Sequence, residues 1–135
     1  MFVNFKDGAV YHFDVKFGTD PGDTITGLSL FDAIEAETTL TTDRLDFGPF
    51  GIFIDGIDFD GHANAGYLGG EDWWHYWNRD GSGPWVFGST SASFRLLGDG
   101  DADGWVYGSA AAPVPEPASL GLLGIASLAV LRRRR

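Results

Sequence analysis

Apolar and polar positions near the start of the chain predict a β-hairpin. Residues 2–5 and 10–17 are rich in apolar side chains and flank an Asp7-Gly8 pair. An Asp-Gly pair between two such runs is a strong hairpin signal. In the second run every other residue from Tyr11 to Phe17 is apolar, which is the period of a half-buried strand. We therefore expect two paired strands.

One helix is predicted, over residues 28–37. Thr26 precedes it and can cap its first backbone N–H groups with the side-chain hydroxyl. Leu30, Phe31 and Ile34 recur at helical spacing and would share one buried face. No other segment of the body carries so clear a helical pattern.

The rest of the body predicts short strands separated by turns. We expect strands within residues 38–42, 50–54, 57–59, 72–78, 85–87, 93–97 and 105–107. A tight turn is predicted at Asp55-Gly56, and residues 62–70 are expected to form a loop of small residues. The fold class is therefore α+β and mostly β, with one short helix.

The composition changes abruptly after this globular domain, which spans residues 1–109. Residues 110–117 form a Pro-rich linker, in which X-Pro steps disfavour helix. Residues 118–131 carry no charge and predict a hydrophobic helix, and the chain ends in an Arg cluster made of Arg132, Arg133, Arg134 and Arg135. The helix would be roughly 21 Å long, short against a bilayer core of about 30 Å. The arginines would keep its end on the cytoplasmic side and the body outside.

This tail resembles the PEP-CTERM sorting signal, because Val114, Pro115, Glu116 and Pro117 precede an apolar run and a terminal Arg cluster. The resemblance implies that an exosortase-type transpeptidase of the inner membrane cuts the chain near the Pro-Glu-Pro tripeptide. It also implies transfer to the cell surface or extracellular matrix in bacteria that make exopolysaccharide. A tail removed after sorting parallels other anchor signals whose apolar segment is cleaved.

The net charge and the Cys content of the chain exclude several classes of ligand and site. The net charge is -10 although the tail holds four of the nine basic residues, so the acidic body lacks the basic footprint that nucleic-acid binding needs. The chain has no Cys, which excludes disulfides and thiolate metal sites.

Residues 1–8 have no basic or apolar signal-peptide regions. Because a C-terminal sorting signal requires export, we expect the natural protein to begin upstream of Met1.

The body, over about residues 10–108, resembles the transcobalamin C-terminal-like domain of bacterial surface proteins. The resemblance is carried by the predicted hairpin and helix, by residues 51–57 and 74–78, and by the acidic segment 98–107. It implies a small β-grasp-like domain. In the vitamin carriers the related domain covers a corrinoid, so a small-ligand or corrinoid-binding module is one alternative function.

Aromatic residues are the candidate glycan-binding groups, because flat rings stack on sugars. On a strand, Trp73 and Trp77 would share one face with His75, and Trp74 and Tyr76 would share the other. One of the two sets must belong to the core. Packing in the core is the competing interpretation for most of this set. The candidates are Trp73, Trp74, Tyr76, Trp77 and Trp85.

An acidic turn offers a candidate calcium site at Asp99, Asp101 and Asp103, because carboxylates at every second position can converge on one ion. The loop lacks the closing Glu, so a plain acidic turn is the alternative. A poorer candidate comprises Asp55, Asp58 and Asp60.

No catalytic motif is present, and His12, His62 and His75 are isolated in sequence. We therefore expect a non-enzymatic surface or matrix protein without a required cofactor. Polysaccharide is the leading candidate ligand of the body. The alternatives are the small-ligand or corrinoid-binding module and a calcium-stabilised adhesive domain.

Overall fold

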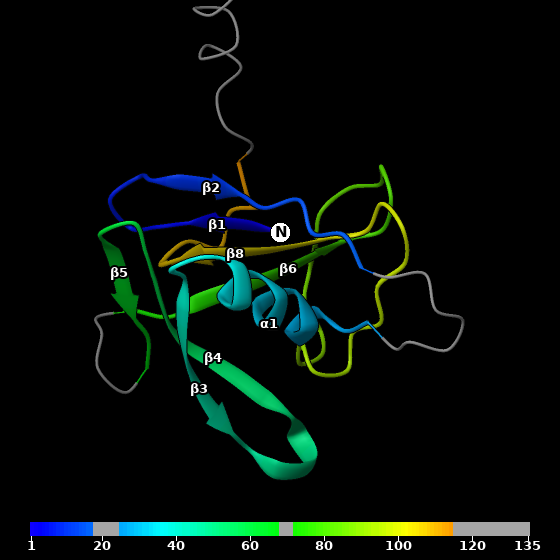
Figure 1. The fold of residues 1–135 in the computed structure, drawn as a ribbon, viewed down its shortest axis with the longest axis horizontal. Coiled ribbons are helices and arrows are strands. Elements are labelled where there is room, and N and C mark those ends of the chain that lie inside the picture. The colour runs from blue at the N-terminus through cyan, green and yellow to red at the C-terminus, as the bar shows by residue number, and fades with distance from the viewer. Residues whose placement is uncertain (18–24, 68–71, 115–135) are drawn as a thin grey trace, which may run out of the picture.

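Two β-sheets and one α-helix make up the fold in the computed structural model, which describes residues 1–17, 25–67 and 72–114 (Figure 1). The larger sheet has five strands in the order β2-β1-β8-β6-β7, and the smaller has three in the order β3-β4-β5. The helix α1 (Gly27–Glu37) lies against one face of the larger sheet (Figure 1). This arrangement confirms the expectation of a mostly β, α+β domain.

The larger sheet joins the beginning and the end of the described chain. Strands β1 (Phe2–Asn4) and β2 (Val10–His12) form the predicted hairpin, and β1 also pairs in parallel with the central strand β8 (Ala102–Tyr107). On its other side β8 pairs antiparallel with β6 (Trp74–Arg79), which pairs with the short edge strand β7 (Val86–Phe87). A parallel pairing of the first and last strands, with α1 crossing one face, is a β-grasp-like topology.

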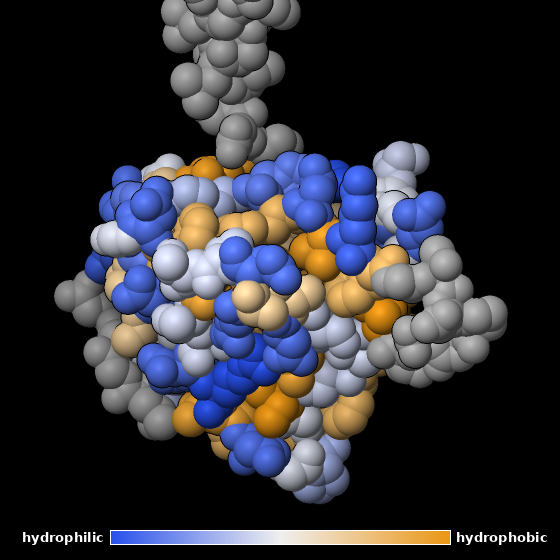
Figure 2. Space-filling model, viewed as in Figure 1, coloured by the Kyte–Doolittle hydropathy of each residue, from blue (hydrophilic) through white to orange (hydrophobic). Residues whose placement is uncertain are grey.

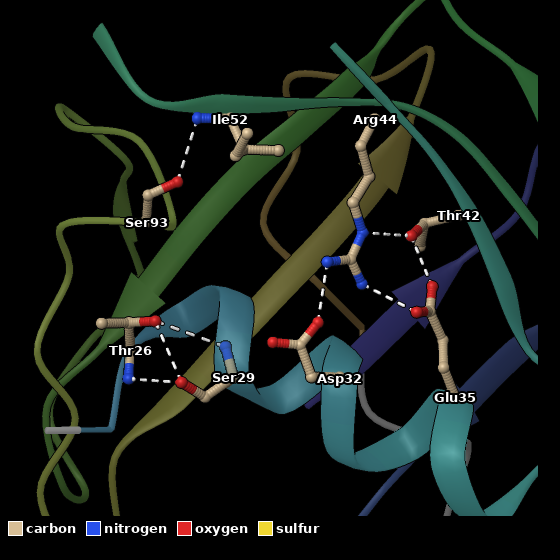
Figure 3. Close-up of polar contacts among 8 residues, drawn as sticks. All are labelled: Thr26, Ser29, Asp32, Glu35, Thr42, Arg44, Ile52 and Ser93. Carbon is tan, nitrogen blue, oxygen red and sulfur yellow. Dashed lines mark hydrogen bonds and ion pairs between the residues drawn. The ribbon is translucent and has the colours of Figure 1, made fainter. Parts of the chain in front are cut away.

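Helix α1 follows the sequence prediction closely. Thr26 accepts a hydrogen bond from the Ser29 backbone N–H, and the Ser29 hydroxyl accepts one from the Thr26 N–H. This reciprocal capping box satisfies backbone donors that a helix start leaves free (Figure 3). Leu30, Phe31 and Ile34 are buried as predicted. The helix therefore covers the inner face of the larger sheet.

In the smaller sheet, the turn predicted at Asp55-Gly56 lies elsewhere. Strand β4 (Ile52–Phe59) continues through Asp55-Gly56 with an irregularity in its pairing at Asp55. The turn lies at Asp60-Gly61, and both of these residues have positive φ. Ile54 and Ile57 flank the rejected turn and are 1% and 2% exposed. A turn at Asp55-Gly56 would interrupt the strand that carries these core side chains.

Several other boundaries differ from the predictions, and β2 ends at His12 although the predicted strand extends to residue 17. Strand β3 (Thr41–Asp46) extends past the predicted 38–42, and β5 (His62–Ala65) replaces the first half of the predicted loop. Residues 93–97 form no strand and make only a single bridge, from Leu96 to Thr26. A short 3-10 helix, η1 (Gly48–Phe50), joins β3 to β4.

Arg44 of β3 connects the smaller sheet to the helix. Its guanidinium contacts the carboxylates of Asp32 and Glu35 at 2.7 and 2.8 Å, both on α1 (Figure 3). Ser93 adds a second connection, because its hydroxyl accepts a hydrogen bond from the Ile52 N–H at 2.9 Å (Figure 3). The β3–β4 hairpin is thereby held beside both α1 and the loop after β7.

The predicted tail lies largely beyond this described part. The hydrophobic segment 118–131 and the Arg cluster fall outside the described residues, as do residues 115–117 of the predicted linker. Among residues 1–17, 25–67 and 72–114, no helix has the length and apolar character needed to cross a membrane.

Candidate binding cleft

Strand β6 sends alternate side chains to opposite faces of the larger sheet, as the sequence predicts. Trp74 and Tyr76 point toward α1 and are only 3% and 9% exposed. The Tyr76 ring stacks on Trp105 of β8 with centroids 4.5 Å apart, and the Trp74 indole N–H donates to the Asn64 carbonyl at 3.0 Å. These two predicted glycan-binding residues belong to the core, where little of either side chain is exposed.

An open cleft of about 380 Å³ lies beside the first half of β6, between the β3–β4 hairpin and the segment after β7. We call it the aromatic cleft. Phe50 and Trp73 at its rim are 81% and 50% exposed. Figure 2 shows hydrophobic surface over the β3–β4 hairpin, at the lower edge of the view. The lining includes Phe47, Phe50, Trp73, His75, Phe87 and Ser91, together with the core residues Trp74 and Tyr76.

A few polar groups accompany these rings. The Nδ1 atom of His75 is buried and has no hydrogen-bond partner among the described residues. Its ring lies between Trp73 and Phe87, with centroids 5.4 and 6.0 Å away. The Ser91 hydroxyl donates to the Ile52 carbonyl at 2.8 Å. Within the described chain, no Asp, Glu, Lys or Arg lines the cleft. The chemistry therefore suits an uncharged ligand with apolar faces and hydroxyl groups.

The two remaining predicted aromatics lie outside the aromatic cleft. Trp77 packs edge-on against Phe87 with centroids 5.3 Å apart. The Trp85 ring is half-buried on the sheet face opposite α1, with the Arg79 guanidinium 4.8 Å from its centre. Of the five predicted residues, only Trp73 is both exposed and part of the cleft.

Phe47 and Phe50 are absent from the candidates that the sequence offers. Phe47 immediately precedes η1, and Phe50 is its last residue, at the end of the hairpin. The sequence predicts a strand at Phe50 instead. A signal was nevertheless present in the segment Phe47-Gly-Pro-Phe-Gly51. Glycine and proline punctuate turns, and a turn that carries two aromatic residues exposes them.

The acidic turn does not assemble the predicted calcium site. Asp103 lies inside β8 and is fully buried, where it accepts hydrogen bonds from the Tyr76 hydroxyl at 2.7 Å and from Arg95 Nε at 2.8 Å. Burial raises the pKa of the Asp103 carboxyl, and these hydrogen bonds oppose the rise. Asp101 instead accepts the backbone N–H groups of Gly98 and Gly81. Asp99 remains exposed at the turn.

Other titratable residues are equally dispersed. In the described ranges, no three His, Cys, Asp or Glu side chains lie close enough to hold a metal ion; these ranges include Asp55, Asp58 and Asp60. His12 stacks on Phe2 with centroids 4.2 Å apart, and His62 contacts Asp7 at 2.6 Å. The three histidines therefore serve separate local contacts.

The sorting residues are described only at their start. Val114 is 58% exposed, whereas the candidate sorting residues Pro115, Glu116 and Pro117 and the membrane-orienting Arg132, Arg133, Arg134 and Arg135 lie outside the described residues.

Comparison with known protein families matches residues 113–135 to the PEP-CTERM protein-sorting motif. Comparison with curated proteins and with solved structures found no significant match. The sorting-signal prediction is therefore confirmed, and the resemblance of the body to transcobalamin-like domains stays a prediction.

Proposed function

We propose that this chain, which carries a PEP-CTERM protein-sorting motif at residues 113–135, is a non-enzymatic protein of the cell surface or biofilm matrix. The motif indicates export that depends on membrane-associated sorting, and motifs of this class are recognised by exosortase. Cleavage of the tail near Pro115-Glu116-Pro117 would leave the described domain outside the membrane. We infer that the domain functions outside the membrane by binding a ligand.

We propose a neutral polysaccharide as the ligand of the aromatic cleft. The observation that carries this proposal is the exposed ring of Trp73 in a cleft where no charged side chain of the described residues forms part of the lining. Sugar rings present C–H faces that stack on aromatic rings, and their hydroxyls can pair with buried polar atoms. His75 Nδ1 supplies such an atom without a partner among the described residues.

The charge of the protein narrows the polymer class. A chain with a formal net charge of -10 repels anionic polymers. A polysaccharide that carries uronate or phosphate groups would meet this repulsion, and the described part of the chain places no Lys or Arg in the cleft to offset it. A neutral glycan is not repelled by the negative charge of the protein and needs no cationic partner in the cleft.

A small apolar ligand is the second candidate. The cleft volume of about 380 Å³ falls within the range of about 300–1,000 Å³ common for small-molecule sites. A corrinoid would reveal itself by a shift of its visible absorbance on mixing with the protein. Such a shift, together with absent glycan binding, would favour this candidate over polysaccharide.

The test uses the full chain and neutral polysaccharide isolated from the host's own matrix, with affinity measured by calorimetry. We expect Trp73→Ala to weaken binding about tenfold, because loss of one stacking ring is worth roughly 1–1.5 kcal/mol. Tyr67→Ala is the matched control, because this side chain is 78% exposed and lies outside the cleft. Equal affinity of Trp73→Ala and the unaltered chain would contradict the proposed site.

A further inference from the structure

The face of the larger sheet opposite α1 carries a row of aromatic side chains with one gap. Strand register places His12, Phe2, Gly104, Trp77 and Phe87 side by side across all five strands. These positions alternate with the inward-facing ones, so they share the outer face. Four members of the row have rings, and Gly104 on the central strand has no side chain.

Pro113, the first residue of the sorting motif, fills this gap. It is buried, and a Cβ atom added at Gly104 would overlap its ring. Trp85 completes the slot, because the same Cβ would lie 3.3 Å from its ring atom Cη2. The Trp85 ring is in turn held edge-on against Phe2, with centroids 5.5 Å apart. Figure 1 shows the chain after β8, in orange, turning back toward the middle of the sheet.

The slot has the chemistry of a proline-recognition site. Proline-rich segments dock on aromatic-lined grooves because their extended conformation is already formed before binding. Here the groove walls are Trp85 and the neighbouring ring of Phe2, and the occupant is the segment 109–114 of the same chain. The X-Pro steps that follow Ala112 favour that conformation.

Contact between this segment and the sheet is incomplete away from Pro113. A cavity of about 590 Å³ lies beside the segment and is lined in part by Asn4. The Oδ1 atom of Asn4 is buried and has no hydrogen-bond partner among the described residues. Ala111 and Ala112 are too small to fill the cavity. Its lining includes Asn4, Val10, Val106, Ala111, Ala112 and Val114. The contact of this segment with the outer face is therefore concentrated at the ring of Pro113.

We propose that the outer face around Gly104 is an intramolecular docking site for the start of the sorting motif, and that release of Pro113 controls access of the processing enzyme. The control of processing rests on the proposed function, whereas the docking does not. Pro113 is the first residue matched by the sorting motif, so docking of Pro113 restrains the chain next to the predicted cut. A protease acts on a segment that has opened locally. While Pro113 is docked, the residues upstream of the cut are held against the sheet and are not accessible to the protease.

Limited proteolysis of the purified full chain tests the docking. An elastase-type protease cuts after small residues, and cleavage of the Ala110–Ala111 bond is followed by mass spectrometry. Gly104→Ala leaves the cleaved segment unchanged but closes the slot, and we expect it to raise the cleavage rate about tenfold. Pro113→Ser empties the slot without altering the sheet and should act alike. Pro84→Ser, at an exposed proline, is the matched control. Equal rates in all four proteins would overturn the docking.

Tail removal in the native host tests the control of processing. We expect Gly104→Ala, which lies outside the sorting motif, to shorten the half-time of tail removal several-fold. An unchanged half-time, combined with faster elastase cleavage, would overturn the control while leaving the docking in place. If the unaltered chain itself kept its tail at the surface, the proposed function would fail, and the elastase comparison would still decide the docking.

Discussion

Arg95 donates its Nε–H to the fully buried carboxylate of Asp103 at 2.8 Å. The pair joins the loop after β7 to the central strand β8. A second guanidinium nitrogen of Arg95 reaches Asp80 at 2.9 Å, and the Tyr76 hydroxyl and Asn78 amide complete the hydrogen bonds to Asp103. The buried carboxylate of Asp103 therefore connects β8 with β6 and with the loop after β7.

Replacing Asp103 tests the importance of this pair. Asp103→Ala would leave Arg95 largely buried without its inner partner, together with the Tyr76 hydroxyl. Removing one member of a buried ion pair costs about 3–5 kcal/mol of unfolding free energy. We expect a loss of this size in urea denaturation followed by tryptophan fluorescence.

Asp99→Ala provides the control, because this exposed carboxylate belongs to the same acidic turn. Surface substitutions of this kind change the unfolding free energy by less than about 0.5 kcal/mol. Equal effects of the two substitutions would show that the Asp103 pair contributes nothing particular to stability.

Asp103 also shows where sequence reasoning reaches its limit. The spacing of Asp99, Asp101 and Asp103 is that of a calcium loop, yet spacing in sequence converges on one ion only if the chain curves around it. Here β8 begins at Ala102, and its alternation turns Asp103 into the core. The partner that makes this burial tolerable is Arg95, which local sequence patterns could not identify.

Local patterns predicted other features well. Periodicity identified α1 with its cap at Thr26, the hairpin around Asp7-Gly8 and the split of β6 between core and opposite face. The second hairpin turn could lie at either Asp55-Gly56 or Asp60-Gly61. It lies at Asp60-Gly61, because β4 must continue past Asp55-Gly56 to bury Ile57. The aromatic cleft escaped prediction because it depends on the tertiary placement of the β3–β4 hairpin beside β6.

The acidic turn also makes stability depend on pH. A hydrogen bond from the Gly98 backbone N–H, assisted by that of Gly81, lowers the pKa of Asp101. A carboxyl whose folded-state pKa lies below its unfolded value stabilises the fold above the unfolded pKa of about 3.9. This contribution is lost as the pH falls through the folded-state pKa.

Asp101→Asn removes the titration while keeping the shape of the side chain. We expect the unfolding free energy of this variant to fall less steeply between about pH 4 and pH 2 than that of the unaltered chain. Urea denaturation at several pH values gives the slope, and Asp99→Asn serves as control in the same turn. A slope identical to that of the unaltered chain would show that Asp101 does not contribute to acid unfolding.

Adjacent tryptophans separate the core from the aromatic cleft. Trp74 is 3% exposed and donates its indole N–H to Asn64, whereas Trp73 is 50% exposed at the cleft rim. Burying and packing a large ring is worth about 3–5 kcal/mol when it is truncated to alanine. We therefore expect Trp74→Ala to lower the unfolding free energy by that amount.

Trp73→Ala should lower the unfolding free energy by less than about 1 kcal/mol, because much of its ring already contacts water. Thermal and urea unfolding of the two variants, measured in one buffer, provide the comparison. Similar losses would mean that Trp73 is a packing residue, and weakened glycan binding by Trp73→Ala would then reflect disturbed structure. A large loss for Trp74→Ala alone makes Trp73 free to act as a binding surface, because its ring is not required to hold the sheet together.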